Sequence, residues 1–430
     1  MKKTLINNTQ SNLRGDITVP GDKSISHRAI MLGSIAYGVT EIDGFLMGAD
    51  CLATIDCFRK MGIQIEVNND KVLVYGDGLH GLKEPDGILD AKNSGTTARL
   101  LSGILAGQPF ESTLTGDSSL KKRPMKRVSV PLSKMGAEFL FLDENEHLPY
   151  TIKGGKLMGK THITNMSSAQ VKSSLLLAGL YADCPTTVIE TSQSRNHSEL
   201  MLEYFGADLK VTDKCEVSIK PEPRLIGQHV IISGDISSAA YFIVAGLICE
   251  GSDILIRNVN INPTRAGIIK VVEAMNGSIA LENMRTVSNE EVADIHVCYS
   301  PNLTGTTISG DIIPTLIDEI PAIAVLAACA KGKTIIADAT ELKVKESNRI
   351  DTVVNGLDAM GATIKSTDDG MVINGGEQLF GANITTQKDH RIAMAFGIAN
   401  LVCKGSVILD DANCVDISFP NFFEILNDLC

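Results

Sequence analysis

The most regular feature of the sequence is the alternation of long apolar segments with segments in which polar and apolar residues alternate. Six segments open with small, amide or charged residues and then run almost entirely apolar, which is typical of helices buried on all sides. They end at Gly38, at Gly107, near Cys184, and at Gly251, Gly332 and Gly405. A second series of helix-like segments ends at Gly62, Gly136, Gly206, Gly277 and Gly361, each followed by an alternating strand.

Strand-like runs separate the two series. The runs 185–191 (PTTVIET) and 252–259 (SDILIRNV) are examples, and hairpin-like pairs such as 63–75 follow the second helices. The predicted unit is therefore βαβαββ, repeated six times at intervals of about 70 residues. The chain stops before the last strands of the sixth copy. The alternating segment at residues 15–19 is predicted to replace them, which would bring both chain ends into one domain.

The repeat predicts the domain organisation. Three units on each side of two short crossings, near 19–21 and 233–235, would form two pseudo-threefold α/β domains that face each other across a cleft. One would span 21–233, and the other 1–20 plus 234–430. Gene duplication with plain loops at the crossings is the alternative. A length of 430 residues gives ample buried core for either arrangement.

Composition narrows the classes of function. A formal charge of −12 and an aromatic content of 4% without tryptophan argue against broad binding to nucleic acid or to anionic membranes. The ten cysteines never form C-x-x-C and mostly lie in apolar runs, which indicates reduced core thiols. With no signal peptide, membrane-length apolar run or metal-spaced histidines apparent, we expect a cytoplasmic protein, a monomer without metal or other cofactor.

Candidate chemistry gathers at the starts of the buried helices, where free N–H groups and the helix dipole favour anions. The polar residues there are Lys23, Ser24, Arg28, Gly95, Ser168, Gln170 and Arg391. The turns before the second helices add the cations Lys122, Arg123, Arg195, Arg265, Lys345 and Arg349. Arginine matches phosphate and carboxylate through its planar fork, so these positions predict a binding site for small anions. For Arg265 and Lys122, a solvated surface charge is an equal alternative.

Two carboxylates lie within this cationic set. Asp318 opens the fifth buried helix, and Glu346 lies between Lys345 and Arg349. One carboxylate that stays ionised and one that holds its proton would suit a base and an acid. Alternatively, Asp318 is only a helix cap and Glu346 only an ion-pair partner of Arg349. His27 and His390 flank the cations and are as consistent with structural histidines as with proton shuttles.

Five sequence blocks resemble the signatures of a known family. VPGDKSISHR at 19–28, NSGTTAR at 93–99, KRPM at 122–125, KESNR at 345–349 and DHR at 389–391 are similar to blocks of 5-enolpyruvylshikimate-3-phosphate synthases, in order and over essentially the whole chain. The SAQ form at 168–170 and SR at 194–195 resemble the bacterial class II branch. The resemblance implies two inside-out α/β lobes of three βαβαββ units each, the enolpyruvyl transferase fold.

The resemblance also implies a reaction and its residues. The enolpyruvyl group of phosphoenolpyruvate would move to the 5-hydroxyl of shikimate 3-phosphate, releasing phosphate, in aromatic amino acid biosynthesis. Shikimate 3-phosphate would bind to Lys23, Ser24, Arg28, Ser168, Gln170, Arg195, Asp318 and Lys345. Phosphoenolpyruvate would bind to Lys23, Gly95, Arg123, Gln170, Arg349 and Arg391. The implied catalytic set is Asp318 as base, Glu346 as acid, and Lys23, with a tetrahedral intermediate and no metal or organic cofactor.

The sequence departs from the family pattern at two places. Many members have a lysine where this chain has Ile417, and some have an asparagine where it has Glu341. The sister transferase that acts on UDP-N-acetylglucosamine uses a loop cysteine, which the segment 120–126 lacks. A pseudo-symmetric anion-binding scaffold that has lost its chemistry is the other alternative. The joint presence of Lys23, Asp318 and Glu346 argues against it.

Overall fold

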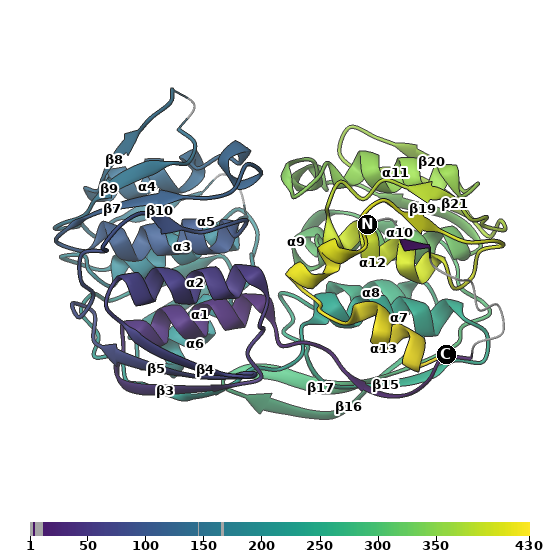
Figure 1. Cartoon of the computed structure of the whole chain (residues 1–430), viewed down its shortest axis with the longest axis horizontal. Coiled ribbons are helices and arrows are strands. Elements are labelled where there is room, and N and C mark those ends of the chain that lie inside the picture. Colours follow the sequence, from purple (N-terminus) through teal and green to yellow (C-terminus); the bar gives the residue numbers. More distant parts are fainter. Residues whose placement is uncertain (1–2, 5–11, 145, 165–166) are drawn as a thin grey trace. The chain divides into compact units, whose positions relative to one another are not determined.

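The computed structural model describes residues 3–4, 12–144, 146–164 and 167–430. The chain separates into two compact units. One comprises Gly21–Ile232 with the short segment Val287–Glu290, here called the 21–232 unit. The other comprises the described residues up to Pro20 together with Ser233–Thr286 and Glu291–Cys430, here called the 233–430 unit. Figure 1 shows the helices of each unit grouped together with strands around them.

The 21–232 unit contains three copies of one motif. Its first helices are α1 (Lys23–Ser34), α3 (Gly95–Ala106) and α5 (Ala169–Gly179), and its second helices are α2 (Ala49–Lys60), α4 (Lys126–Met135) and α6 (His197–Tyr204). The first sheet has the order β14 (His229–Ile231), β3 (Tyr37–Asp43), β5 (Lys71–Asp77), β4 (Gln64–Asn68). The second has β6 (Leu89–Asp90), β7 (Glu111–Thr115), β9 (Tyr150–Lys153), β8 (Glu138–Phe141). The third has β10 (Thr161–Ile163), β11 (Thr186–Ile189), β13 (Glu216–Ile219), β12 (Leu209–Asp213).

The 233–430 unit repeats the motif. Its first helices are α7 (Ile236–Ile248), α10 (Ile320–Cys329) and α12 (His390–Ala399), and the others are α8 (Gly267–Ala274), α9 (Ile313–Leu316), α11 (Arg349–Ala359) and α13 (Phe422–Asp428). One sheet has the order β16 (Ser278–Val287), β17 (Glu290–Cys298), β15 (Asp253–Asn260), β2 (Arg14–Thr18). Another has β18 (Thr307–Ile308), β19 (Gly332–Ile336), β21 (Met371–Gly375), β20 (Thr363–Ser366). The last has three strands, β1 (Lys3–Thr4), β23 (Ile408–Leu409) and β22 (Asn383–Ile384).

The predicted unit βαβαββ is confirmed by the strand pairing. In each four-stranded sheet the leading strand runs parallel to the second strand, which pairs antiparallel with the hairpin that closes the unit. The apolar helices lie inside each unit, as predicted. α10 packs against both α7 and α12, and α3 packs against both α1 and α5. Every residue of α7 except Ile248 is buried, which explains why its sequence has no polar face.

The N-terminal segment does not have the predicted role. Residues 14–18 form β2, which runs parallel to β15 and leads the fourth copy. The sixth copy is completed instead by Lys3–Thr4, which pairs antiparallel with Ile408–Leu409. The alternating pattern of 14–18 is the same for any half-exposed strand, so it could not identify the partner. Both chain ends do share one unit, since the Arg14 amide donates to the Leu429 carbonyl at 3.1 Å.

One glycine of the second helix series is not the residue that ends its helix. Gly62 follows α2 with φ of +87°, the left-handed conformation that closes many helices. In the fourth copy Asn276 takes that conformation, with φ of +60°, one residue before Gly277. Asparagine tolerates this region better than other residues with side chains, so the extra residue shifts the cap without changing the motif.

Within the described part of the chain, no single helix is both long and apolar enough to cross a membrane. The segments Gly310–Leu316 and Ile320–Cys329 would qualify only together, and a bend of 111° separates them.

Candidate active site

Two of the buried helices of the 21–232 unit, α1 and α3, begin with polar side-chain caps. Asp22 Oδ1 accepts a hydrogen bond from the Ile25 amide at 2.9 Å and caps α1. Ser94 Oγ accepts one from the Thr97 amide at 3.0 Å and caps α3. These caps satisfy part of the first turn and leave the other N–H groups of each helix start for a ligand.

Arg28 is the most firmly held of the predicted phosphate ligands. Its guanidinium donates to Ser198 Oγ at 2.7 Å, to Ser173 Oγ at 3.0 Å and to the Ser24 carbonyl at 2.9 Å. Burial lowers the pKa of Arg28 to about 10, although nearby carboxylates, chiefly Glu199, act to raise it. The guanidinium therefore stays charged at neutral pH. Lys23, at the start of the same helix, forms an ion pair with the buried carboxylate of Asp50.

The starts of α3 and α5 lie side by side. Gln170 Nε2 donates to Thr96 Oγ1 at 3.1 Å, and Gln170 Oε1 accepts from Arg99 at 2.5 Å. A Cβ atom at Gly95 would lie 3.0 Å from one Arg99 nitrogen and 3.6 Å from one of Arg123. The structure therefore brings three predicted residues, Gly95, Arg123 and Gln170, around the Arg99 guanidinium.

The remaining predicted residues of this unit lie on the third copy and on the turn before α4. Ser168 precedes α5 as its cap residue. Arg195 lies in the turn before α6, and its charge contributes to lowering the pKa of Arg28 after the larger effects of burial and nearby carboxylates. Lys122 is exposed, as its surface-charge alternative required, whereas Arg123 is half-buried and donates to Asn93 Oδ1 at 2.8 Å.

His27 is a structural residue in a chain of buried hydroxyls. Its Nδ1 lies 2.7 Å from Thr54 Oγ1, which lies 2.7 Å from Thr97 Oγ1, and Thr97 donates to Ser94 Oγ at 2.8 Å. Burial, with the charges of Lys23 and Arg28, holds the pKa of His27 well below its ordinary value. A neutral imidazole here links α1, α2 and α3.

Arg349 is the centre of the corresponding cluster in the 233–430 unit. It contacts Asp389 Oδ2 at 2.8 Å, Glu346 Oε2 at 2.6 Å and Asp318 Oδ1 at 3.2 Å. Burial alone would lower the pKa of Arg349, but the charges of Asp389, Glu346 and Asp318 raise it overall. Asp318 and Glu346, the predicted base and acid, thus share one buried guanidinium.

Asp318 receives two further cations. Lys345 Nζ lies 3.3 Å from its Oδ1, and Arg391 donates to its backbone carbonyl at 3.2 Å. The alternative that Asp318 only caps a helix is not what the structure shows, since the cap residue of α10 is Glu319. The ion pair of Glu346 with Arg349 does exist, and it leaves the Glu346 side chain 22% exposed.

Asp389 orients the arginines. One of its oxygens accepts from the Arg391 amide at 3.0 Å and caps α12, and the other accepts from Ser347 Oγ at 2.9 Å. Burial opposes ionisation, yet the charge of Arg349 lowers the pKa of Asp389 below its ordinary value. His390, beside it, is buried.

The surface-charge alternative for Arg265 is wrong. Arg265 is 2% exposed and lies 2.7 Å from the buried carboxylate of Glu319. It also donates to Ser237 Oγ and contacts Asp235 Oδ1 at 3.4 Å. This pair joins the starts of α7 and α10, and the polar spacing of the sequence could not distinguish such a buried role from an exposed one.

Comparisons with known proteins agree with this arrangement. The family model described as EPSP synthase (3-phosphoshikimate 1-carboxyvinyltransferase) matches residues 7–426. The chain belongs to the EPSP synthase family. A 3-phosphoshikimate 1-carboxyvinyltransferase from Desulforamulus reducens is 51% identical over 426 residues, 99% of each chain, and one from a Thermoanaerobacter species is 53% identical over 417 residues, 97% of this chain and 98% of the relative.

Solved structures extend the comparison to the fold. The EPSP synthase of Acinetobacter baumannii matches with a TM-score of 0.90 and 43% identity, covering 100% of this chain and 98% of that one. The enolpyruvyl transferase NikO from Streptomyces tendae, at 14% identity, shares the fold with a TM-score of 0.79, covering 99% of this chain and 96% of that one. The predicted family, fold and enzyme class are confirmed: the chain is a transferase of the shikimate pathway with the enolpyruvyl transferase fold.

The structure adds two candidate residues that the sequence analysis did not single out, Arg99 and Asp50. Arg99 ends the block 93–99, and its spacing of four residues from Gly95 on a helix was an available signal for its position. Asp50, which pairs with Lys23, lies in no motif. Ile417 ends a 3₁₀ helix, Asn413–Ile417, and Glu341 lies in another, Thr340–Val344.

Among the residues that the structure describes, the groups with metal-ligand character lie on the sheets. Among the described residues, Asp253, His296 and Cys298 form one such group on β15 and β17. Glu41, Asp43 and His229 form the other on β3 and β14.

Proposed function

We propose that this chain transfers the enolpyruvyl group of phosphoenolpyruvate to the 5-hydroxyl of shikimate 3-phosphate and releases phosphate. The observation that carries the residue assignment is the sharing of Arg349 by Asp318 and Glu346. A base and an acid fixed by one guanidinium keep a constant separation, and this is what two coordinated proton transfers need.

The proposed ligands of shikimate 3-phosphate are those implied by the family blocks. They are Lys23, Ser24, Arg28, Ser168, Gln170, Arg195, Asp318 and Lys345. Support comes from Arg28, whose guanidinium contacts two hydroxyls and a carbonyl, which are neutral oxygens. A guanidinium held in this way keeps its charge for a phosphate.

The proposed ligands of phosphoenolpyruvate are a second set of cations and helix N–H groups. They are Lys23, Gly95, Arg123, Gln170, Arg349 and Arg391. The close approach of Gly95 to the Arg99 and Arg123 guanidiniums supports this assignment, because the backbone N–H at a helix start and an arginine can then share one anion. Lys23 is assigned to both substrates, which places it in the catalytic set.

In the proposed mechanism Asp318 accepts the proton of the 5-hydroxyl of shikimate 3-phosphate, while the oxygen of this hydroxyl bonds to C2 of phosphoenolpyruvate. Glu346 gives its proton to the methylene carbon C3, and the product is a tetrahedral intermediate. The Glu346 carboxylate then takes a proton from C3, the C2–O bond to phosphate breaks, and the enol ether and phosphate are released. The surrounding cations stabilise the two anionic substrates at short distance.

The proposal includes lobe closure. Segments 21–233 and 1–20 plus 234–430 would act as two lobes of three repeats that close on the substrates and exclude water. The division of the chain into two compact units supports this. Saturating shikimate 3-phosphate should reduce the radius of gyration measured by small-angle scattering. An unchanged radius would contradict closure.

The proposal also covers the state of the protein in the cell, a cytoplasmic monomer that needs no metal or organic cofactor. The cysteines form no disulfide among the described residues, which fits a reducing compartment, and Cys51, Cys57, Cys249, Cys403 and Cys414 are buried. Light scattering at micromolar concentration should give the mass of one chain. A dimer mass would contradict the monomer.

The deciding experiment is phosphate release from phosphoenolpyruvate with and without shikimate 3-phosphate, after dialysis against a chelator. We expect release only with both substrates. Absence of release would overturn the function. Release with UDP-N-acetylglucosamine in place of shikimate 3-phosphate would indicate the sister reaction.

A further inference from the structure

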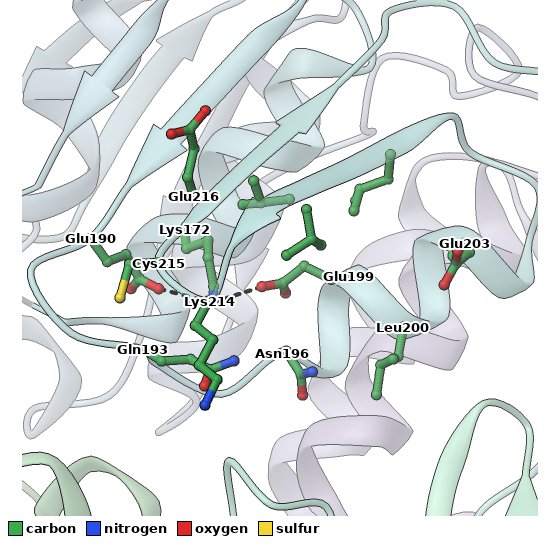
Figure 2. A pocket seen from close by; sticks show the side chains of 13 residues that line it. Lys172, Glu190, Gln193, Asn196, Glu199, Leu200, Glu203, Lys214, Cys215 and Glu216 are labelled. Carbon is green, nitrogen blue, oxygen red and sulfur yellow. Dashed lines mark ion pairs between the residues drawn. The ribbon is translucent and has the colours of Figure 1, made fainter.

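A buried ion triad lies next to residues that hold Arg28 and Arg195, two of the proposed shikimate 3-phosphate ligands. Lys172 on α5 contacts Glu190 at 2.9 Å and Glu199 on α6 at 2.7 Å. All three side chains are at most 8% exposed. Figure 2 shows Lys172 between the two carboxylates, in the wall of a pocket of about 200 Å³. No family block includes Lys172.

The first arm of the triad holds the turn that carries Arg195. Glu190 Oε2 accepts hydrogen bonds from the Ser194 amide at 3.2 Å and from Ser194 Oγ at 2.9 Å. Lys172 Nζ donates to the Ser194 carbonyl at 3.3 Å. Both polar groups of the Ser194 backbone are therefore fixed by the triad, and Arg195 is the next residue.

The second arm reaches the helix that holds Arg28. Glu199 follows Ser198, whose hydroxyl accepts from Arg28 Nε at 2.7 Å and lies 2.6 Å from Ser173 Oγ. Ser173 follows Lys172 on α5 and also accepts from Arg28. A change in the Lys172–Glu199 contact would therefore move both hydroxyls that orient the Arg28 guanidinium.

Lys172 is also tied to the start of its own helix, two residues after Gln170. The Lys172 ammonium group on α5 thus contacts both Glu199 in the first turn of α6 and the Ser194 carbonyl in the turn before α6. The second oxygen of each carboxylate, Glu190 Oε1 and Glu199 Oε2, has no hydrogen-bond partner among the described residues. Lys172 is accordingly the main compensation for both negative charges.

We propose that Lys172 is a positioning residue for shikimate 3-phosphate, which fixes Arg28 and Arg195 in one geometry through its contacts with Glu190, Glu199 and Ser194. This inference rests on the proposed function. A buried ion pair contributes little net stability compared with apolar residues of the same volume. Its directional contacts, however, can specify a single arrangement of the loops around it.

The test is Lys172→Met, which keeps an unbranched side chain, one heavy atom shorter, and removes its charge. We expect the KM for shikimate 3-phosphate to rise about tenfold or more, while the KM for phosphoenolpyruvate and kcat change by less than about threefold. Lys172→Arg, which restores the charge, should recover part of the affinity. Ile152→Ala is the matched control, because it opens the core of the same unit without touching these loops.

Each outcome decides the inference. A folded Lys172→Met enzyme with an unchanged KM for shikimate 3-phosphate overturns it, and so does an equal rise in KM in the Ile152→Ala control. If Lys172→Met does not fold, Glu190→Gln takes its place. It leaves the neutral Lys172–Glu199 pair, weakens the hold on Ser194, and should raise the same KM about threefold. An unchanged KM in Glu190→Gln would then refute the inference.

Calorimetric titration with shikimate 3-phosphate separates this inference from the proposed function. If the wild-type chain binds shikimate 3-phosphate but releases no phosphate, the function fails while the effect of Lys172→Met on the Kd still tests the inference. If the wild-type chain binds no shikimate 3-phosphate, both fail.

Discussion

Arg28 on α1 and Arg349 at the start of α11 are both buried arginines, one in each unit, and they have opposite kinds of partner. Arg28 contacts two serine hydroxyls and a backbone carbonyl, and no carboxylate contacts it among the described residues. Arg349 contacts three carboxylates. Neutral partners keep a cation available for an anion, whereas carboxylate partners are themselves oriented by the cation. The 21–232 unit thus holds a buried guanidinium among neutral oxygens, whereas the 233–430 unit holds one among three carboxylates.

The largest expected effect is on turnover, and it tests the acid that Arg349 is proposed to fix. Glu346→Ala should lower kcat by roughly 10³ or more, because no other group replaces the acid that protonates the methylene carbon. Arg349 keeps Asp389 and Asp318, so the protein should fold and still bind shikimate 3-phosphate. Steady-state phosphate release and calorimetry measure the two quantities. Near-normal turnover would refute the role of Glu346, and Asp358→Ala, an exposed carboxylate on the same helix as Arg349, is the control.

The second prediction tests the binding of shikimate 3-phosphate by Arg28. Arg28→Met should raise the KM for shikimate 3-phosphate about a hundredfold, since a charge-assisted contact to the phosphate is lost, with a smaller effect on phosphoenolpyruvate. The side-chain groups that lose their partner in this variant are serine hydroxyls and not carboxylates, so no buried charge is left uncompensated. The variant should therefore fold. Initial-rate kinetics with each substrate varied in turn measure both constants. Arg59→Met on α2, where the guanidinium contacts the Ile65 carbonyl and Asp56 among the described residues, should change neither constant.

The third prediction sharpens the account of the phosphoenolpyruvate ligands. Gly95→Ala places a methyl group 3.0 Å from an Arg99 nitrogen, and Arg99 is bonded to Gln170. The shift of these side chains should raise the KM for phosphoenolpyruvate by about three- to tenfold, with a smaller rise in the KM for shikimate 3-phosphate because Gln170 is a proposed ligand of both substrates. Gly87→Ala, where an added Cβ has no neighbour within 4 Å, is the matched control. Equal constants in both variants would contradict the close packing proposed for this ligand.

The smallest effect concerns the neutral histidine behind the cations. The unfolded chain protonates His27 near pH 6.5, whereas burial and the charges of Lys23 and Arg28 keep the folded pKa well below that value. The unfolded state then binds more protons, so the free energy of unfolding falls as pH drops below 6.5, by up to about 1.4 kcal/mol per pH unit. His27→Gln should flatten this dependence between pH 7 and 5 in urea denaturation. Parallel curves for the two proteins would show that His27 is not the group responsible.

The sequence predicted the repeat better than it predicted the partners within it. The apolar runs identified all six buried helices, because a helix surrounded by core has no polar face to interrupt its pattern. The sequence did not predict the pairing partners of the two N-terminal strands. Residues 14–18 pair with β15 and Lys3–Thr4 with β23, and these pairings depend on contacts across more than 200 positions.

The candidate site residues were likewise predicted only in part from the sequence. The motifs supplied Lys23, Arg28, Arg123, Arg349 and Arg391, since charged residues in blocks of fixed spacing stand out against apolar helices. The spacing could not tell whether such a charge is compensated. Arg265 proved to be buried against Glu319, and Lys172 proved to be buried between two carboxylates.

The sequence by itself determined the family, the six-fold repeat and the residue types at the helix starts, because local pattern and motif spacing encode them. The tertiary structure alone decided which strand completes each sheet and which arginine contacts hydroxyls and which contacts carboxylates. The physical reason is that the effect of a charge depends on its burial and on its nearest polar atoms, which come from distant parts of the chain.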